Sequence, residues 1–192
     1  MIVCFSASSP ISSVALVSSH GELLFGDQRE TSQNASGACM EMLDRGLREI
    51  SRALTDATVI CADVGPGSFI GTRVGVTLAK SLAFVLGLNA AGATSFDLID
   101  PSQTVVLPSK RGEFFVRRPG EEPFRTSDLP ENVFMGYGPG IETQIVPNAA
   151  RFASLLQQIE PVEPVRLMPC YLIEPSISTP RRPFTSRVAK GK

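Results

Sequence analysis

Residues 58–88 read TVICADVGPGSFIGTRVGVTLAKSLAFVLGL, and this stretch predicts a strand, a glycine-rich turn and a long helix. The β-branched and apolar residues 58–62 are typical of a buried strand, and Gly-Pro-Gly at 65–67 carries the strongest turn signal of the chain. Ser68 suits a helix N-cap and Gly87 suits a C-terminal stop, so a helix is expected over 68–86. A buried strand therefore leads through a glycine loop into a helix.

The predicted helix carries a ridge of very small residues. Small residues recur every four positions, at Gly71, Gly75, Ala79, Ala83 and Gly87. Such a ridge lets another element approach closely, and a glycine inside a helix costs about 1 kcal/mol relative to alanine, so a compensating contact is expected. Two interpretations stay open. The ridge packs within the chain, or the ridge and the face beside it, with Arg73, Val76 and Lys80, meet a partner protein.

The residues before this stretch predict a small sheet and a second helix. Apolar runs at 2–5 and 13–17, followed by 22–26, indicate three strands separated by turns. Since 2–5 is almost wholly apolar, this strand is expected in the middle of a sheet that is covered on both faces. An amphipathic helix is expected over 36–54, because apolar residues recur at spacings of three and four at Met40, Leu43, Leu47, Ile50 and Leu54.

The residues after it predict a smaller second unit. A strand is expected at 90–93, and the first lobe is expected to span 1–100, with a smaller C-terminal lobe over 101–175. Candidate strands of that lobe are 105–107, 113–117 and 133–136, and a candidate helix covers 149–159. A basic tail, 176–192, holds Arg181, Arg182, Arg187, Lys190 and Lys192. The tail is interpreted as a flexible, solubilising end, with contact to nucleic-acid phosphates as the alternative.

The composition excludes several classes of function. The chain has 192 residues, 43% of them apolar, which indicates a globular protein, and its 18 Lys+Arg and 19 Asp+Glu leave a net charge of -1. A net charge this small produces no overall electrostatic field that would attract the whole protein to nucleic acid or to anionic lipid. The single histidine, His20, is expected in an exposed hairpin tip and excludes sites that need two imidazoles. Four cysteines without a CxxC pair, no secretory signal and no membrane-length apolar run predict a soluble cytoplasmic protein.

The glycine loop itself is a weak candidate for phosphate binding. Gly65, Gly67 and Ser68 precede a helix, where backbone amides can approach an anion. However, Gly71 stands where a P-loop has its lysine, and Ile70 stands where a dinucleotide fingerprint has a glycine. Generic mononucleotide binding therefore remains a secondary interpretation.

The segment 62–88 reads ADVGPGSFIGTRVGVTLAKSLAFVLGL. It resembles the signature segment of the bacterial TsaB (YeaZ) family, whose usual spelling is close to GPGSFTGLRVG. Three further segments agree in order. Residues 2–16, IVCFSASSPISSVAL, are similar to the family's first hairpin, 110–115, KRGEFF, to its RRGEVY stretch, and 171–174, YLIE, to its YLRE. The resemblance spans most of the chain.

This resemblance implies both a fold and a role. The expected fold is α/β, a two-lobed actin-like, sugar-kinase and Hsp70 (ASKHA) fold with mixed sheets flanked by helices. The implied role is that of a non-catalytic scaffold that binds TsaD, with TsaE joining, and supports formation of N6-threonylcarbamoyladenosine beside the anticodon of tRNAs reading ANN codons. No cofactor is expected for the chain itself, with ATP or ADP only at the level of the complex. Pairing with a second copy when TsaD is absent stays open as an alternative, and no membrane partner is expected.

The chain departs from the family where catalytic relatives of the fold carry an acid. Ser6-Ala7-Ser8 stands where Asp-Thr-Ser is usual, and Pro108-Ser109 stands where Asp-Ala is frequent. No catalytic residue and no metal ligand are therefore predicted. The alternatives are a small ASKHA-fold phosphotransferase or phosphatase that uses 65–73 for phosphate, and a homodimeric binding module. An acid at the place of Ser6 would favour the enzyme.

The resemblance also implies the partner surface. Members of the family dimerise through the two helices predicted here, which assemble with equivalent helices of TsaD or of a second copy. The residues predicted at this surface are Met40, Leu43 and Leu47 of the first helix, and Gly71, Arg73, Val74, Gly75, Leu78, Ala79 and Leu82 of the second.

Overall fold

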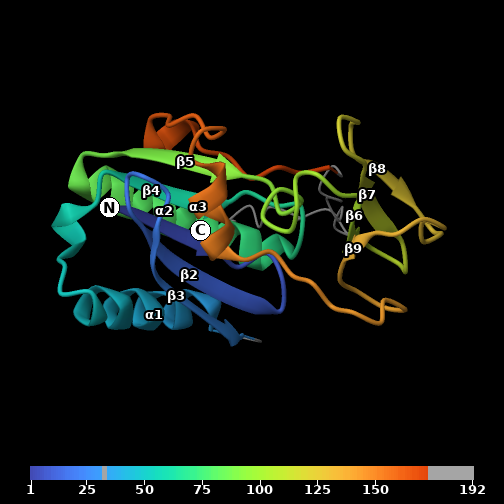
Figure 1. The fold of residues 1–192 in the computed structure, drawn as a ribbon, viewed down its shortest axis with the longest axis horizontal. Coiled ribbons are helices and arrows are strands. Elements are labelled where there is room, and N and C mark those ends of the chain that lie inside the picture. Colours follow the sequence, from blue (N-terminus) through green and yellow to red (C-terminus); the bar gives the residue numbers. More distant parts are fainter. Residues whose placement is uncertain (32–33, 173–192) are drawn as a thin grey trace, which may run out of the picture.

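A computed structural model describes residues 1–31 and 34–172, which build two sheets of different size. The larger sheet has the strand order β3-β2-β1-β4-β5 (Figure 1). Its strands are β1 (Ile2–Ser6), β2 (Ile11–Val17), β3 (Leu23–Glu30), β4 (Val59–Asp63) and β5 (Asn89–Ala93). The first three pair antiparallel, whereas β4 pairs parallel with both β1 and β5. The apolar first strand therefore lies in the centre, as predicted.

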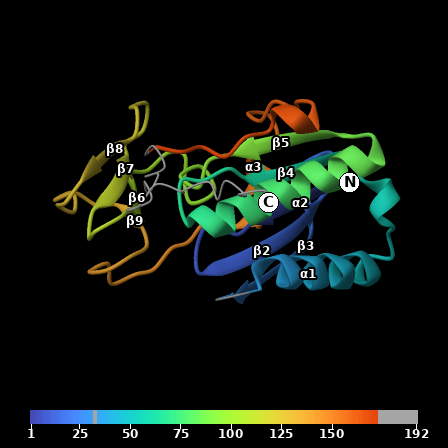
Figure 2. The same cartoon turned by 180° about the vertical axis from the view of Figure 1, so that it is seen from behind.

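Helices cover both faces of this sheet. On one face lie α1 (Ala35–Glu49) and α2 (Phe69–Leu86), and on the other lie the 3-10 turn η2 (Ala149–Arg151) and the one-turn α3 (Phe152–Leu155). Figure 2 shows α2 in front of the strands, and Figure 1 shows α3 there. Side chains of β1 alternate, so that Val3 and Phe5 join the core under α1 and α2, while Cys4 joins the core under α3.

The ends of α2 are those that the sequence predicts. The Ser68 hydroxyl accepts a hydrogen bond from the Gly71 amide at 3.2 Å, and Gly87 adopts the left-handed conformation with φ of 67°. In contrast, α1 ends at Glu49 rather than near Leu54. Ser51 has a φ of 54°, and a short 3-10 turn η1 (Leu54–Asp56) follows, so the chain leaves the helix early to enter β4.

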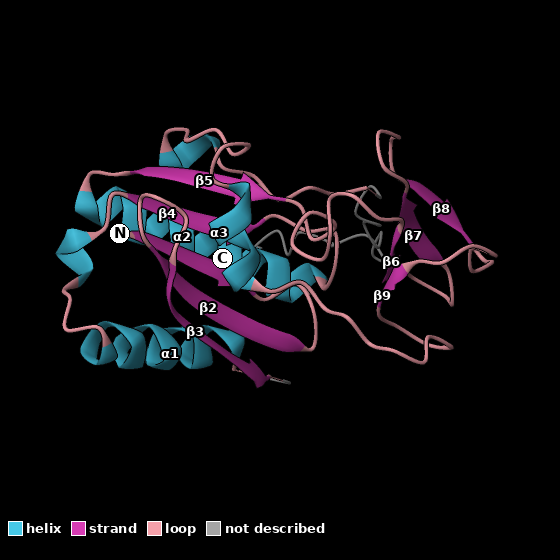
Figure 3. Ribbon diagram, in the orientation of Figure 1, coloured by secondary structure: helices cyan, strands magenta, loops and turns pink. Residues whose placement is uncertain are grey.

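The smaller sheet has the order β8-β7-β6-β9 and lies at one end of the molecule (Figure 3). Its strands are β6 (Val105–Pro108), β7 (Phe114–Arg117), β8 (Phe124–Thr126) and β9 (Met135–Gly136). Only two residues of the predicted strand 133–136 form a ladder, with Val105 and Val106. Phe96 and Ile99, which follow β5, pack against one face of this sheet and connect the two lobes.

After β9 the chain returns to the first lobe, which corrects the predicted domain boundary. The Ala149 amide donates to the Ser13 hydroxyl at 2.9 Å, and Phe152 is buried in the same core as Cys4. Val162 pairs with Ala90 at the edge of the larger sheet. The second lobe is therefore shorter than the predicted 101–175, because the segment after β9 covers the first lobe instead.

The predicted helix over 149–159 is reduced to η2 and α3. A turn occupies 156–158, and Pro161 stands just before Val162, which pairs with Ala90. A proline disfavours helical backbone in the residue before it, so the chain becomes extended where the sheet offers a partner. The predicted tail 176–192 and the last two residues of the 171–174 segment lie outside the described residues.

Candidate functional site

A buried carboxylate lies where the lobes meet. Asp63 ends β4 beside Ser6 at the end of β1, because the two strands run parallel with Phe5 opposite Ala62. The Asp63 Oδ2 accepts hydrogen bonds from the Ser6 hydroxyl at 2.7 Å and from the Ser8 hydroxyl at 2.5 Å. Its Oδ1 accepts bonds from the Ser95 hydroxyl at 2.6 Å and from the Gly65 amide at 2.8 Å. All four donors therefore point at one carboxylate.

The environment of Asp63 opposes its ionisation. Complete burial raises the pKa of Asp63 above its usual value, and the hydrogen bonds from the three serines and the Gly65 amide counteract only part of this rise. An acid therefore lies beside Ser6, on the neighbouring strand. Position 6 itself is a serine. Asp63 is nevertheless engaged by four donors and does not line the adjoining cleft.

The glycine loop makes its contacts inside the protein. The Gly65 amide is engaged by Asp63, and the Ser68 amide donates to the Ser8 carbonyl at 2.6 Å. A side chain at Gly67 would overlap that same Ser8 carbonyl, so close packing requires a glycine there. Two of the three residues proposed as a phosphate loop therefore have amides that are not free for an anion, which corrects the predicted loop.

The small-residue ridge of α2 faces the chain's own sheet. Gly71, Gly75, Ala79 and Ala83 are all buried. A methyl group at Gly71 would overlap the carbonyl oxygen of Ala7, whereas one at Gly75 would lie 3.8 Å from the Asp63 carbonyl oxygen. Of the two interpretations of the ridge, packing within the chain is the one the structure shows.

The outer face of α2 exposes large apolar side chains near both of its ends, with Arg73, Thr77 and Ser81 exposed between them. Ile70 is 74% exposed, Phe84 80% and Val85 79%. Within the described residues, α2 is long and apolar enough by composition to cross a membrane, although the sequence contains no uninterrupted apolar run of that length. In the structure, 33% of the residues of α2 are buried. Core helices of soluble proteins pass the same test, so this property alone does not indicate a span. Among the described residues, no element covers the large apolar side chains of Ile70, Phe84 and Val85.

The N-terminal turn of α2 is tied to the last described residues. The Arg73 guanidinium lies 3.8 Å from the centroid of the Phe69 ring, and its Nε donates to the Tyr171 hydroxyl at 2.9 Å. The Cys170 amide donates to the Val64 carbonyl at 2.7 Å. The segment that ends at Leu172 therefore runs beside the start of α2 and forms a wall of the cleft.

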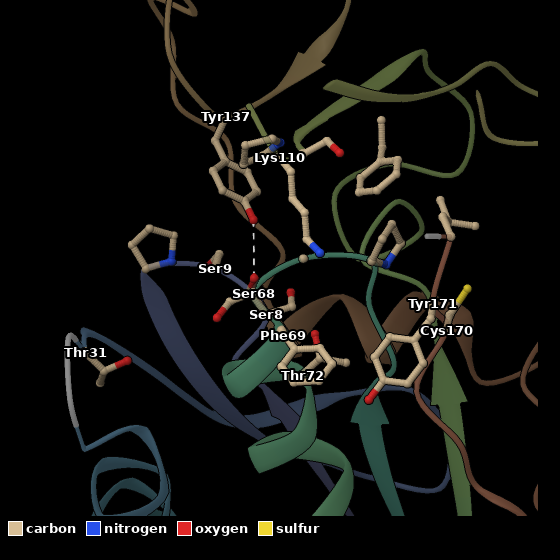
Figure 4. A pocket seen from close by; sticks show the side chains of 17 residues that line it. Ser8, Ser9, Thr31, Ser68, Phe69, Thr72, Lys110, Tyr137, Cys170 and Tyr171 are labelled. Atoms are coloured by element: carbon tan, nitrogen blue, oxygen red, sulfur yellow. Dashed lines mark hydrogen bonds between the residues drawn. The ribbon is translucent and has the colours of Figure 1, made fainter. Parts of the chain in front are cut away.

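A cleft of about 800 Å³ opens between the lobes (Figure 4). Ser8, Ser68 and Thr72 line it from the first lobe, and Lys110 and Tyr137 line it from the second. The Tyr137 hydroxyl donates to the Ser8 carbonyl at 3.4 Å and so bridges the lobes. Burial, and to a smaller extent the charge of Asp63, raise the pKa of Tyr137. Tyr137 is therefore a neutral donor at any physiological pH.

Two solved structures share this architecture over almost their whole length. One, described as an uncharacterized protein with similarity to peptidase YeaZ from Pseudomonas aeruginosa, has a TM-score of 0.75 at 16% identity and covers 90% of this chain and 99% of its own. YeaZ from Pseudomonas aeruginosa has a TM-score of 0.73 at 18% identity and covers 89% of this chain and 99% of its own. The chain has the YeaZ fold. The expected two-lobed α/β architecture is confirmed.

A family model agrees with this fold. The model for TsaD, tRNA N6-adenosine threonylcarbamoyltransferase, matches residues 29–99, which include α1, β4, α2 and β5. Among curated proteins, none matches the sequence. The resemblance to the TsaB (YeaZ) family inferred from the sequence is therefore supported by the fold and by this segment.

In the YeaZ fold of this chain, the predicted partner surface divides into two sets. The buried set is Leu43, Gly71, Gly75 and Ala79, which pack inside the first lobe and cannot form a surface, so their assignment was wrong. The other set reaches the surface fully or in part and stays a prediction: Met40, Leu47, Arg73, Val74, Leu78 and Leu82. The sequence reasoning missed Ile70, Phe84 and Val85, which are the most exposed apolar residues of α2.

The sequence reasoning also missed Asp63. Its signal was an acid at the end of a buried strand, directly before the Gly-Pro-Gly turn. Within residues 1–31 and 34–172, no three or more His, Cys, Asp or Glu side chains gather as a metal site requires. Asp63 thus stands among hydroxyl groups rather than among other acids, and its arrangement organises the loops around the cleft.

Proposed function

We propose that this chain is a non-catalytic subunit of the TsaB type, which binds a TsaD-type threonylcarbamoyltransferase through the outer face of α2. In this role it holds the transferase in a working state, with TsaE joining, for threonylcarbamoylation of tRNA in the cytoplasm. The observation that carries the proposal is the large apolar side chains on the outer face of α2, with Ile70, Phe84 and Val85 each more than 70% exposed.

The geometry of α2 suits a helix-to-helix contact. Ile70 and Val85 lie 15 residues apart, which corresponds to about 22 Å along a helix. Half-buried Val74, Leu78 and Leu82 lie between these ends, beside the exposed Arg73, Thr77 and Ser81. Large exposed apolar surfaces on soluble proteins mark sites of interaction. Because the buried ridge anchors the other side of α2 to the sheet, the helix presents a rigid surface and loses little entropy on binding.

The state of Asp63 favours a scaffold over a phosphotransferase. A carboxylate that binds a metal or activates a nucleophile must face the substrate. Asp63 is fully buried and accepts four hydrogen bonds from Ser6, Ser8, Ser95 and Gly65. Its role is therefore to hold loops, and any nucleotide chemistry belongs to the partner. No cofactor is assigned to the chain itself.

The test is the solution mass of the protein with and without TsaD from the same organism, measured by light scattering on a size-exclusion column. A Val85→Lys variant places a charge on the outer face of α2, and Val133→Lys is its matched control. Val133 is 88% exposed on the second lobe, so both changes replace an exposed valine by lysine. Lysine is also tolerated near a helix C-terminus, so Val85→Lys is not expected to unfold α2.

We expect a one-to-one complex with wild type and with Val133→Lys, and none with Val85→Lys. A complex that forms equally with both variants would exclude the outer face of α2 as the contact. Absence of any mixed species, while the wild type forms a homodimer that Val85→Lys abolishes, would show a homodimeric binding module instead.

A further inference from the structure

We propose that the cleft between the lobes binds a small organic anion with a flat apolar body, without a metal ion. The site lies between Lys110 and the N-terminus of α2 and is separate from the outer face of that helix. The proposal therefore does not depend on the partner proposed above. It rests on a cation, on free amides, on an unpartnered buried hydroxyl and on the aromatic walls of the cleft.

Lys110 supplies the positive charge. Figure 4 shows its side chain extending from the second lobe toward the loop that leads into α2. Among the described residues that line the cleft, Lys110 is the one charged side chain, and within 1–31 and 34–172 it takes part in no ion pair. A cation that faces an aromatic cleft without a counter-charge favours an anionic ligand.

The N-terminus of α2 faces the same space. Of its first amides, that of Ser68 is engaged by the Ser8 carbonyl and that of Gly71 by the Ser68 hydroxyl. In the part of the chain that the structure describes, no hydrogen bond engages the amides of Phe69 and Ile70. With 18 residues, α2 is long enough to develop a full helix dipole, and its N-terminus favours a negative group.

An independent observation is the hydroxyl of Thr72. Thr72 lines the cleft and is only 3% exposed, yet its Oγ1 has no hydrogen-bond partner among the described residues. The Ser109 hydroxyl, on the opposite wall, is likewise buried without a partner. A buried hydroxyl left without a partner is unfavourable, so a ligand atom between these walls would relieve that cost.

The other residues of the cleft define the class of ligand. Phe69, Phe115, Tyr137 and Tyr171 provide aromatic walls, which suit a flat apolar body. No carboxylate lines the cleft within the described residues, since Asp63 lies beneath Ser8 and is held by four donors. A magnesium-bound triphosphate needs such a carboxylate. The ligand is therefore a carboxylate or a phosphate monoester, with its charge held by Lys110.

The experiment is calorimetric titration of the isolated protein in EDTA at low ionic strength. The probes are 1-naphthoate, its uncharged amide 1-naphthamide, and AMP as a phosphate monoester. We expect at least one anion to bind, and naphthoate to bind about tenfold or more tightly than naphthamide, as loss of one charged hydrogen bond implies. Naphthoate without AMP assigns a carboxylate, and AMP without naphthoate assigns a phosphate monoester.

Two variant pairs test the residues. Lys110→Gln should weaken binding about tenfold, whereas Arg111→Gln, which removes the neighbouring charge that does not line the cleft, should leave it unchanged. Thr72→Val should weaken binding, whereas Thr77→Val on the exposed side of α2 should not. Thermal unfolding of each variant confirms that it is folded.

Several outcomes overturn the proposal. Equal affinity of Lys110→Gln and Arg111→Gln would show that Lys110 does not hold the anion. Equal affinity for naphthoate and naphthamide would show an apolar cleft without an anion site. Binding of AMP only after addition of magnesium would show metal-dependent nucleotide binding. Absence of binding by both anions would likewise refute the site.

Discussion

Two glycines one turn apart on α2 give the sharpest test of how this helix packs. At Gly75, a methyl group would lie 3.8 Å from the Asp63 carbonyl oxygen and 3.9 Å from the Ala7 amide nitrogen, which is ordinary contact. Alanine gains about 1 kcal/mol over glycine inside a helix, so Gly75→Ala should raise the free energy of unfolding by about that amount. Within the described residues, no close contact at Gly75 therefore requires a glycine rather than an alanine.

Gly71→Ala should have the opposite effect. Its methyl group would overlap the carbonyl oxygen of Ala7, which belongs to the backbone between β1 and β2 and cannot rotate away. Overpacking of this kind costs roughly 1–3 kcal/mol, and a clash with backbone lies at the upper end. After the gain of about 1 kcal/mol in helix propensity, a net loss of about 2 kcal/mol remains. The two variants should therefore differ by about 3 kcal/mol.

The assay is urea unfolding followed by circular dichroism, with both variants and the wild type at the same pH. For an m-value of about 1–3 kcal/mol per molar urea, the two midpoints should be separated by about 1 M or more. Equal shifts of both variants would refute the orientation of α2 described here. Stabilisation by Gly71→Ala would do so most directly, because it would mean that Ala7 does not cover this position.

Three further predictions concern buried groups. Asp63→Asn replaces an acceptor of four hydrogen bonds by an amide that carries its own donors. It should lower the free energy of unfolding by about 2–4 kcal/mol in urea titrations. An unchanged urea midpoint would contradict these hydrogen bonds. Because burial raises the pKa of Asp63 in the folded state, the native protein binds its proton more tightly than the unfolded chain does. The advantage of wild type over Asp63→Asn should thus shrink as pH rises above about 3.9, the pKa of an unfolded aspartate, and an advantage that grows with pH would reverse this sign. Finally, burial raises the pKa of the Cys4 thiol, which lies opposite Cys61 in the pairing of β1 with β4. Iodoacetamide should therefore label Cys4 only as fast as the protein unfolds, which peptide mass spectrometry would measure. Rapid labelling of Cys4 in the native protein would refute its burial.

Local signals account for the parts of the fold that the sequence predicts well. Ser68 and Gly87 mark the ends of α2 because capping depends on a few neighbouring residues. The apolar run 2–5 identifies a central strand because a strand with two covered faces cannot alternate apolar with polar residues. Local signals do not show where the chain must turn toward a distant partner: the predicted helix over 149–159 ends at Leu155, and a turn then leads to Val162, which pairs with Ala90.

The sequence by itself determined that α2 exists, where it begins and ends, and that it carries a face of small residues. It also carried the resemblance to the TsaB family. Only the tertiary structure decided which face of α2 is buried, because periodicity shows two faces of a helix without showing what covers each. It likewise decided that Asp63 stands beside Ser6, since residues 57 positions apart in the chain meet only when β1 and β4 pair. A carboxylate can thus be absent from one position of the chain and still lie beside that position in space.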